Sequence, residues 1–310
     1  MRPPIFNLVP PGDPAAHHDT PELKKAALDI ATRTGINLLR HMYGQFPLIL
    51  TYLDEDTAIE NPLPLTQYQR PPPLAKANFP DDVEFIRQIN EGGATPIFLV
   101  KTEDNLRLLK MFPAFGPVPE SYRPSRRPDS GRPVDPMRPF MREKEAYAHL
   151  QHGGVCEKGY VPQCYGWVEL TQAHVEAIAR AVPGLVYGDG QDLDDLLDKA
   201  YEGLFPKGIL IEYFPDAQVL STRNVTRELA EKAVPSLYAI HAAYVLHGDV
   251  QQHNILLLPD GRVIWIDFDS SMCGSDPRLH RHNLFLELQG GWSIFYRRLV
   301  SALVSMSNYD

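Results

Sequence analysis

Three side chains with oxygen donors occupy fixed positions in the C-terminal part of the sequence: Asp249, Asn254 and Asp267. Asn254 and Asp267 flank two short apolar runs joined by Pro-Asp-Gly at 259–261, a typical turn sequence. We expect the two runs to pair as a hairpin, which brings its two ends together. Asp249 precedes Asn254 by five residues, in a loop that follows a predicted helix. Two carboxylates and an amide at one rim suit Mg²⁺ better than zinc.

Each of these residues alone could belong to an ordinary turn, but their order is more specific. His-x-Asp-x-x-x-x-Asn begins at His247, and Ile-Asp-Phe follows at 266–268. This order resembles the catalytic loop and the metal-binding segment of the protein-kinase-like superfamily. The runs at 160–166 and 265–269 are most similar to compact kinase-like proteins of fungi, and the His-Gly-Asp form is shared with aminoglycoside and choline kinases.

The resemblance implies an ATP site with members further upstream. Lys110 would hold the α- and β-phosphates, and Lys101 on the preceding run is the competing candidate. Glu143 would pair with that lysine, and Glu145 is the alternative. Gly92 and Gly93, in the run 90–95, occupy the place of the glycine-rich phosphate loop. The run 211–214 occupies the place of the hinge that binds adenine, which makes Glu212 and Phe214 cofactor-binding candidates.

The resemblance also assigns roles around the loop. Asn254 and Asp267 would hold Mg²⁺, and Asp249 would be the catalytic residue that acts on the acceptor hydroxyl, assisted by Lys110 and Glu143. We expect His247 to hydrogen-bond the backbone of its own loop rather than to contact substrate.

The elements that must position these residues can be predicted from local patterns. Runs at 96–101 and 106–112 predict a hairpin, 208–214 a buried strand, and 140–150 a helix. A helix is expected at 226–243, kinked at Pro235, and another begins at Thr20 and ends near Tyr43. Five aspartates between 188 and 198 predict the start of a solvated helix rather than a metal cluster.

These elements indicate an α+β fold, and the resemblance implies a bilobal one with a β-rich N-lobe and a reduced helical C-lobe. We expect an N-terminal arm over 1–80, with one helix and a proline-rich linker. The N-lobe would span 81–207, with a Pro/Arg-rich insertion at 113–139 and a second insertion at 171–207. The C-lobe would span 208–310.

Several residues depart from the protein-kinase pattern. Gly248 replaces an arginine that senses a phosphorylated activation loop, Gln251 replaces a lysine beside the catalytic aspartate, and Asp269 replaces the last glycine of the metal-binding triplet. Only 41 residues of the sequence follow Asp269, so within this resemblance we expect most of the helices that grip peptide substrates to be missing. These departures favour a small-molecule acceptor over a protein.

Two classes of function remain open. The first is an ATP- and Mg²⁺-dependent phosphotransferase that acts on a hydroxyl of a small molecule, or of a protein. The second is a pseudokinase or scaffold module, which the poor glycine loop, Gln251 and the reduced C-lobe support. A kinase-like fold diverted to another group-transfer chemistry is a further alternative.

Composition excludes other classes. Lys plus Arg number 30 against 39 Asp plus Glu, a net charge of −9, which disfavours a broad nucleic-acid surface. Three separated cysteines give neither a disulfide framework nor a zinc pair. No apolar run is long enough for a signal peptide or a membrane span. We therefore expect a cytoplasmic protein.

Overall fold

The computed structural model describes residues 68–90, 95–103, 105–113, 138–187, 190–221, 223–274, 276, 279, 283–284 and 286–295. The predicted helix from Thr20, the glycine pair Gly92 and Gly93, and most of the Pro/Arg-rich insertion lie outside the described residues.

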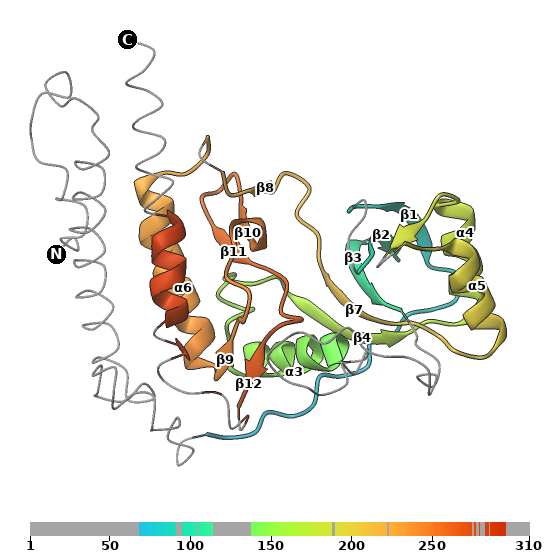
Figure 1. Cartoon of the computed structure of the whole chain (residues 1–310), viewed down its shortest axis with the longest axis horizontal. Coiled ribbons are helices and arrows are strands. Elements are labelled where there is room, and N and C mark those ends of the chain that lie inside the picture. Colours follow the sequence, from blue (N-terminus) through green and yellow to red (C-terminus); the bar gives the residue numbers. More distant parts are fainter. Residues whose placement is uncertain are drawn as a thin grey trace, which may run out of the picture.

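A five-stranded antiparallel sheet forms the centre of one half of the structure (Figure 1). Its order is β1 (Glu84–Gln88), β2 (Ile97–Thr102), β3 (Asn105–Phe112), β7 (Lys207–Glu212) and β4 (Cys164–Glu169). The predicted hairpin is confirmed as β2 and β3, and the predicted strand at 208–214 is confirmed as β7. Asn90 closes the base of the connection between β1 and β2, because its side chain bonds Thr95 and Ile97.

The two faces of this sheet contact different elements because side chains alternate along each strand. On β3, Leu109 and Met111 are fully buried against α4 (Gln172–Ala181) and α5 (Leu193–Tyr201), the helices of the second insertion. Lys110 and Phe112 point to the opposite face, where α3 (Arg138–His152) crosses β7 and β4. The helix predicted at 140–150 is therefore confirmed, and it lies beside Lys110.

The acidic run of the second insertion is structural. The short strands β5 (Val186–Tyr187) and β6 (Gln191–Asp192) lead into α5, whose N-cap is Asp192. The Asp192 carboxylate accepts hydrogen bonds from the backbone of Asp194 and Asp195, and Asp195 closes a capping box. The prediction of a helix start here is confirmed.

The other half contains α6 (Arg227–Ala242), which includes Pro235, and two small sheets of short strands. β8 (Gln218–Val219), β10 (Ile255–Leu257) and β11 (Val263–Trp265) form one sheet; β9 (Val245–Leu246) and β12 (Met272–Cys273) form another. The predicted hairpin around the Pro-Asp-Gly turn is confirmed as β10 and β11. Trp265 is fully buried and its Nε1 donates to Ser236 Oγ at 2.9 Å, which fixes β11 on α6.

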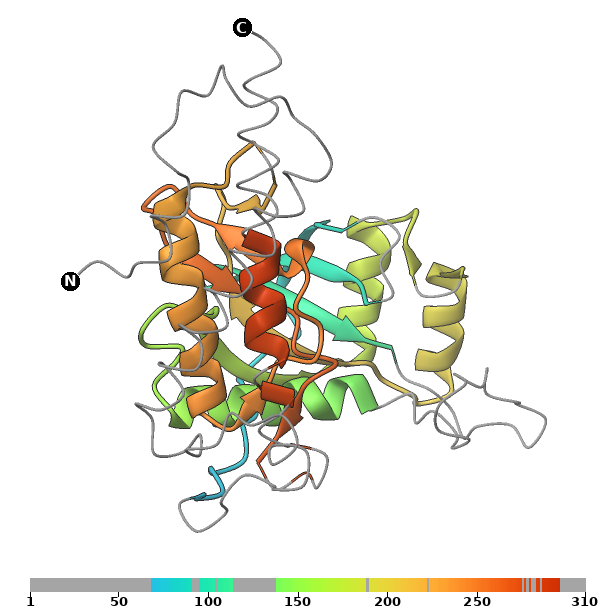
Figure 2. The ribbon, with the colours of Figure 1, turned by 60° about the vertical axis from the view of Figure 1, so that its left-hand side comes forward.

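A last helix at 286–295 lies beside α6 (Figure 2). Leu288, Trp292 and Phe295 from this helix are buried in the same apolar core as α3 and α6. The fold is therefore mixed α+β, as expected. Among the described helices none is long and apolar enough to cross a membrane.

Candidate functional site

Lys110 is the centre of the candidate site. Although its side chain is a cation, the residue is only 4% exposed. Its Nζ lies 2.5 Å from Glu143 Oε2 on α3, 2.6 Å from Asp267 Oδ1 and 3.6 Å from Asp269 Oδ2. The strand alternation on β3 and the inward face of α3 bring together Lys110 and Glu143, which are 33 positions apart. The segment after β11 adds Asp267, which is 157 positions from Lys110.

The opposite charges in this group offset the effect of burial on one another's pKa values. Burial alone would lower the pKa of Lys110, but the three carboxylates raise that pKa above its ordinary value. Burial alone would raise the pKa of Asp267, but the ammonium beside it keeps that pKa below its ordinary value. Burial raises the pKa of Glu143 to about 7, against the opposing effect of Lys110. The lysine is therefore charged, and its charge is shared among three acids.

The alternative candidates, Lys101 and Glu145, do not lie at this site. Lys101 is exposed on β2, and Glu145 is exposed on the opposite side of α3 from Glu143. Of the two candidate lysines and two candidate glutamates, Lys110 and Glu143 are the ones that meet.

Asp267 reaches Lys110 from an unusual backbone conformation. Its φ of +71° lies in the left-handed region that residues with a Cβ rarely adopt. The preceding residue fixes this geometry: the Ile266 N–H donates to the Asn254 carbonyl, and the Ile266 carbonyl lies 3.0 Å from His247 Nε2. His247 thus has a backbone partner, as expected, but that partner belongs to the Asp267 segment and not to its own loop.

The Asp249 carboxylate is held from both sides. Asn254 Nδ2 donates to Asp249 Oδ2 and to the Asp249 carbonyl, both at 2.9 Å. Gln251 Nε2 donates to Asp249 Oδ1 at 2.8 Å. Gln251, which replaces a lysine of the protein-kinase pattern, therefore orients the aspartate without supplying a positive charge.

The residues named for Mg²⁺ fit that ion in chemistry but supply few ligands. Asn254, Asp267 and the neighbouring Asp269 offer only oxygen donors, and the two carboxylate side chains are 36% and 28% exposed. Within the described residues, no group of three or more His, Cys, Asp or Glu forms a complete metal-binding set. An ion here would depend on water or phosphate oxygens for the rest of its coordination, which is usual for Mg²⁺.

The two hinge candidates have local partners. Glu212 Oε2 accepts from the Gln163 backbone at 3.1 Å, and the Arg262 guanidinium lies 5.8 Å from the Phe214 ring. These contacts hold β7 and the segment after it, and none of them reaches Lys110. Gly92 and Gly93 lie outside the described residues.

Glu287 was missed by sequence reasoning, although it supports the loop that carries Asp249. Its carboxylate accepts from the backbone N–H of His247 at 2.9 Å and of Gly248 at 2.7 Å. His241 Nε2 on α6 lies 2.7 Å from the same carboxylate. Burial would raise the pKa of Glu287, but the bond with His241 and the nearby His247 keep it below its ordinary value. No spacing in the sequence links Glu287 to the loop.

Gly248 has a steric reason to be glycine. Its φ is +82°, and a Cβ at this position would lie 2.2 Å from the Ser270 carbonyl oxygen. The loop before Asp249 and the segment after Asp269 therefore approach too closely for any side chain. The sequence suggested only the loss of a regulatory arginine at this position.

The family model described as "Kinetochore Sim4 complex subunit FTA2" matches residues 61–271. The chain belongs to this family. The match includes every candidate residue from Gly92 to Asp269 and ends before Glu287. No curated protein matches the chain.

Proposed function

We propose that this FTA2-family protein is a protein-binding subunit of a kinetochore complex, in which a two-lobed kinase-like fold serves as a binding module. In this proposal the lobes span 81–207 and 208–310, preceded by the arm 1–80. The family description supports protein partners, and it favours the kinetochore over the cytoplasm as the place of action.

The observation that supports binding over catalysis is the state of Lys110. A phosphate-binding lysine must offer its charge to the nucleotide, but this ammonium already has three carboxylates within 3.6 Å. One of them, Asp269, replaces a glycine of the protein-kinase pattern. ATP would add further negative charge to a site in which acids already outnumber the lysine, so repulsion weakens nucleotide binding.

A second candidate function is an ATP- and Mg²⁺-dependent phosphotransferase. It is favoured by the meeting of Lys110 with Glu143 and Asp267, and by the hydrogen bonds that orient Asp249. In this function Lys110 would hold phosphates, Asn254 and Asp267 would hold Mg²⁺, and Asp249 would orient an acceptor hydroxyl of a small molecule or a protein. Bound Mg²⁺ would neutralise charge on the phosphates.

Nucleotide binding separates the two functions. Thermal unfolding of the full chain is measured with ATP at millimolar concentration, with and without Mg²⁺. A bound nucleotide at one hundred times its dissociation constant would stabilise the protein by about 2.7 kcal/mol. The binding-module proposal expects no Mg²⁺-dependent shift. A shift that Asp267→Asn abolishes would instead support the phosphotransferase.

Complex assembly is the complementary measurement. The chain is co-expressed with the other subunits of its kinetochore complex, and co-purification is compared for wild type and Asp249→Asn. A binding module should assemble equally well in both forms, because Asp249 is not needed to hold a partner. Failure of the wild-type chain to assemble would contradict the proposal.

A further inference from the structure

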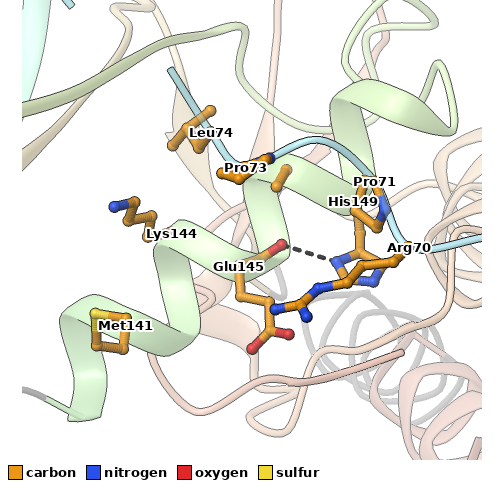
Figure 3. Close-up of a pocket in the computed structure, with 9 residues that line it drawn as sticks. Arg70, Pro71, Pro73, Leu74, Met141, Lys144, Glu145 and His149 are labelled. Carbon is orange, nitrogen blue, oxygen red and sulfur yellow. Dashed lines mark hydrogen bonds between the residues drawn. The ribbon is translucent and has the colours of Figure 1, made fainter. Parts of the chain in front are cut away.

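A groove lies on the side of α3 that faces away from Lys110 (Figure 3). It has a volume of about 230 Å³, and its walls come from the extended segment 70–74 and from α3. Apolar side chains line most of it, namely Pro71, Pro73, Leu74, Met141 and Ala148. Small-molecule sites usually exceed about 300 Å³, so this volume suits a single anchoring side chain better. Met141, which lines the groove, is 53% exposed and therefore accessible to a partner.

The rim of the groove around Lys144 is basic and aromatic, while one carboxylate, Glu145, lines the groove beside Arg70. The Lys144 ammonium lies 4.1 Å from the centre of the Trp167 ring, and Lys76 lies 5.3 Å from the same ring. No carboxylate pairs with Lys144 among the described residues. Burial and the neighbouring Lys207 lower the pKa of Lys144, which is the response of a cation without a counter-ion.

The charges of this rim do not balance. Glu169 lies 3.6 Å from Lys76 and 4.0 Å from Lys207, and no described carboxylate pairs with Lys144. Counting the groove and its rim together, four cations (Arg70, Lys76, Lys144 and Lys207) face two carboxylates (Glu145 and Glu169). The protein as a whole carries a net charge of −9, which makes a local excess of positive charge informative. An acidic ligand would be attracted to this rim.

We propose that this groove, formed by residues 70–74 and the outward face of α3, docks an acidic segment of another protein subunit. One apolar side chain of that segment fills the pocket beside Met141 and Leu74. Acidic side chains on either side of it bind Lys144 and Lys76. The inference rests on the proposed function, since it names the surface through which the binding module would hold a partner.

A site-specific crosslinker tests the groove directly. Benzoylphenylalanine is placed at position 141 of the full chain, which is co-expressed with the other subunits of its complex and irradiated. The expected product joins position 141 to a partner segment in which at least two acids lie near an apolar residue. Lys144→Glu should lower the yield of this product about tenfold or more, whereas Lys144→Arg should retain it. The crosslinker at Tyr201, exposed on α5, is the matched control and should not give the same product.

Lys76→Glu is a second charge reversal at an exposed position, where misfolding is not a concern. Normal yield in both reversals would overturn the proposal. So would a crosslink to a segment of this same chain, to a second copy of it, or to a basic partner segment, and so would the absence of any crosslink. If the wild-type chain does not co-purify with other subunits, the proposed function fails as well. If the chain co-purifies with the other subunits but gives no crosslink, the proposed function stands and only the docking proposal for the groove is wrong.

Discussion

The buried ammonium of Lys110 stabilises the fold only while its acids are present, and the reverse holds for Glu143. Both side chains are almost inaccessible to water, at 5% and 1% exposed. Removing one partner of a buried pair leaves an uncompensated charge, which costs about 3–5 kcal/mol. We therefore predict that Lys110→Met lowers the free energy of unfolding by about this amount, measured by urea denaturation.

Lys101→Met is the matched control, because Lys101 is exposed on the neighbouring strand and should tolerate the change. A Lys110→Met/Glu143→Leu double variant should recover part of the loss, since it removes both charges. If the single variant were as stable as wild type, Glu143 would not depend on Lys110 and the charge-sharing account would be wrong.

Glu287 gives a prediction with a pH dependence. Its folded-state pKa is below the ordinary value of 4.5, so its stabilising effect is complete above that value and is lost as pH falls toward the folded-state pKa. Glu287→Gln should therefore be less stable than wild type at pH 7 by about 1–3 kcal/mol, because charged hydrogen bonds to two backbone amides and His241 are weakened. Urea denaturation at several pH values measures this difference.

The difference between wild type and Glu287→Gln should shrink as pH falls below 4.5 toward the folded-state pKa, because Glu287 is protonated first in the unfolded chain and then in the native protein. Glu157→Gln, at an exposed position, should differ little from wild type at any pH. A constant difference across the pH range would mean that the substitution acts through packing and not through charge.

Sequence analysis identifies some residues of the site because they lie at a recognisable spacing. Asp249, Asn254 and Asp267 belong to one hairpin and its approach, so local rules bring them together. Lys110 and Glu143 could be named only by resemblance, since nothing local joins a strand at 105–112 to a helix at 138–152. Glu287 had neither signal, because two of its partners are backbone N–H groups that any sequence possesses and the third, His241, lies 46 positions away.

At the scale of elements, the sequence predicts the long helices and hairpins correctly but does not predict the shortest strands. The hairpins, α3 and α6 have apolar runs or helical periodicity over many residues. By contrast, β5, β6, β9 and β12 have two residues each, too few for any period to emerge. The second insertion was recognised as a helix start, but its role as a cover for the sheet depends on tertiary contacts.

The close approach of two loops at Gly248 can be tested with a glycine of similar conformation. Gly248 and Gly190 both have positive φ, +82° and +92°, but a Cβ at Gly190 would meet nothing within 4 Å. Gly190→Ala should therefore cost only the backbone strain, about 1 kcal/mol. Gly248→Ala should cost at least about 2 kcal/mol, because strain adds to the overlap with Ser270.

Thermal and urea unfolding of the two alanine variants give the comparison. Equal losses of stability would show that the 247–249 loop and the 269–271 segment can separate at little cost. That result would mean that this contact does not fix the position of Asp249 relative to Asp267.

At the scale of the whole molecule, the sheet is covered on both faces. Antiparallel sheets often leave one face in water, but the run Phe98-Leu99-Val100 on β2 is buried throughout. One face packs with α3 and the core around α6, and the other packs with α4 and α5 of the second insertion. The continuous apolar run of β2 is thus explained by cover on both faces, which the sequence analysis did not predict.

The cover can be removed with little disturbance of the strands. Glu169 and Lys207 are paired at adjacent ends of β4 and β7, so an Asn-Gly turn in place of residues 170–206 would close the two strands as a hairpin. Because this deletion exposes Leu109, Met111 and the rest of that face, we predict a chain that self-associates and binds hydrophobic dyes, as measured by size-exclusion chromatography and dye fluorescence. Ile178→Asp in the full chain, which places a charge in the same fully buried layer, should lower stability by about 3 kcal/mol or more. A deleted chain that remains monomeric and unfolds like wild type would mean that α4 and α5 are an appendage, and that the inner face alone holds Lys110 in position.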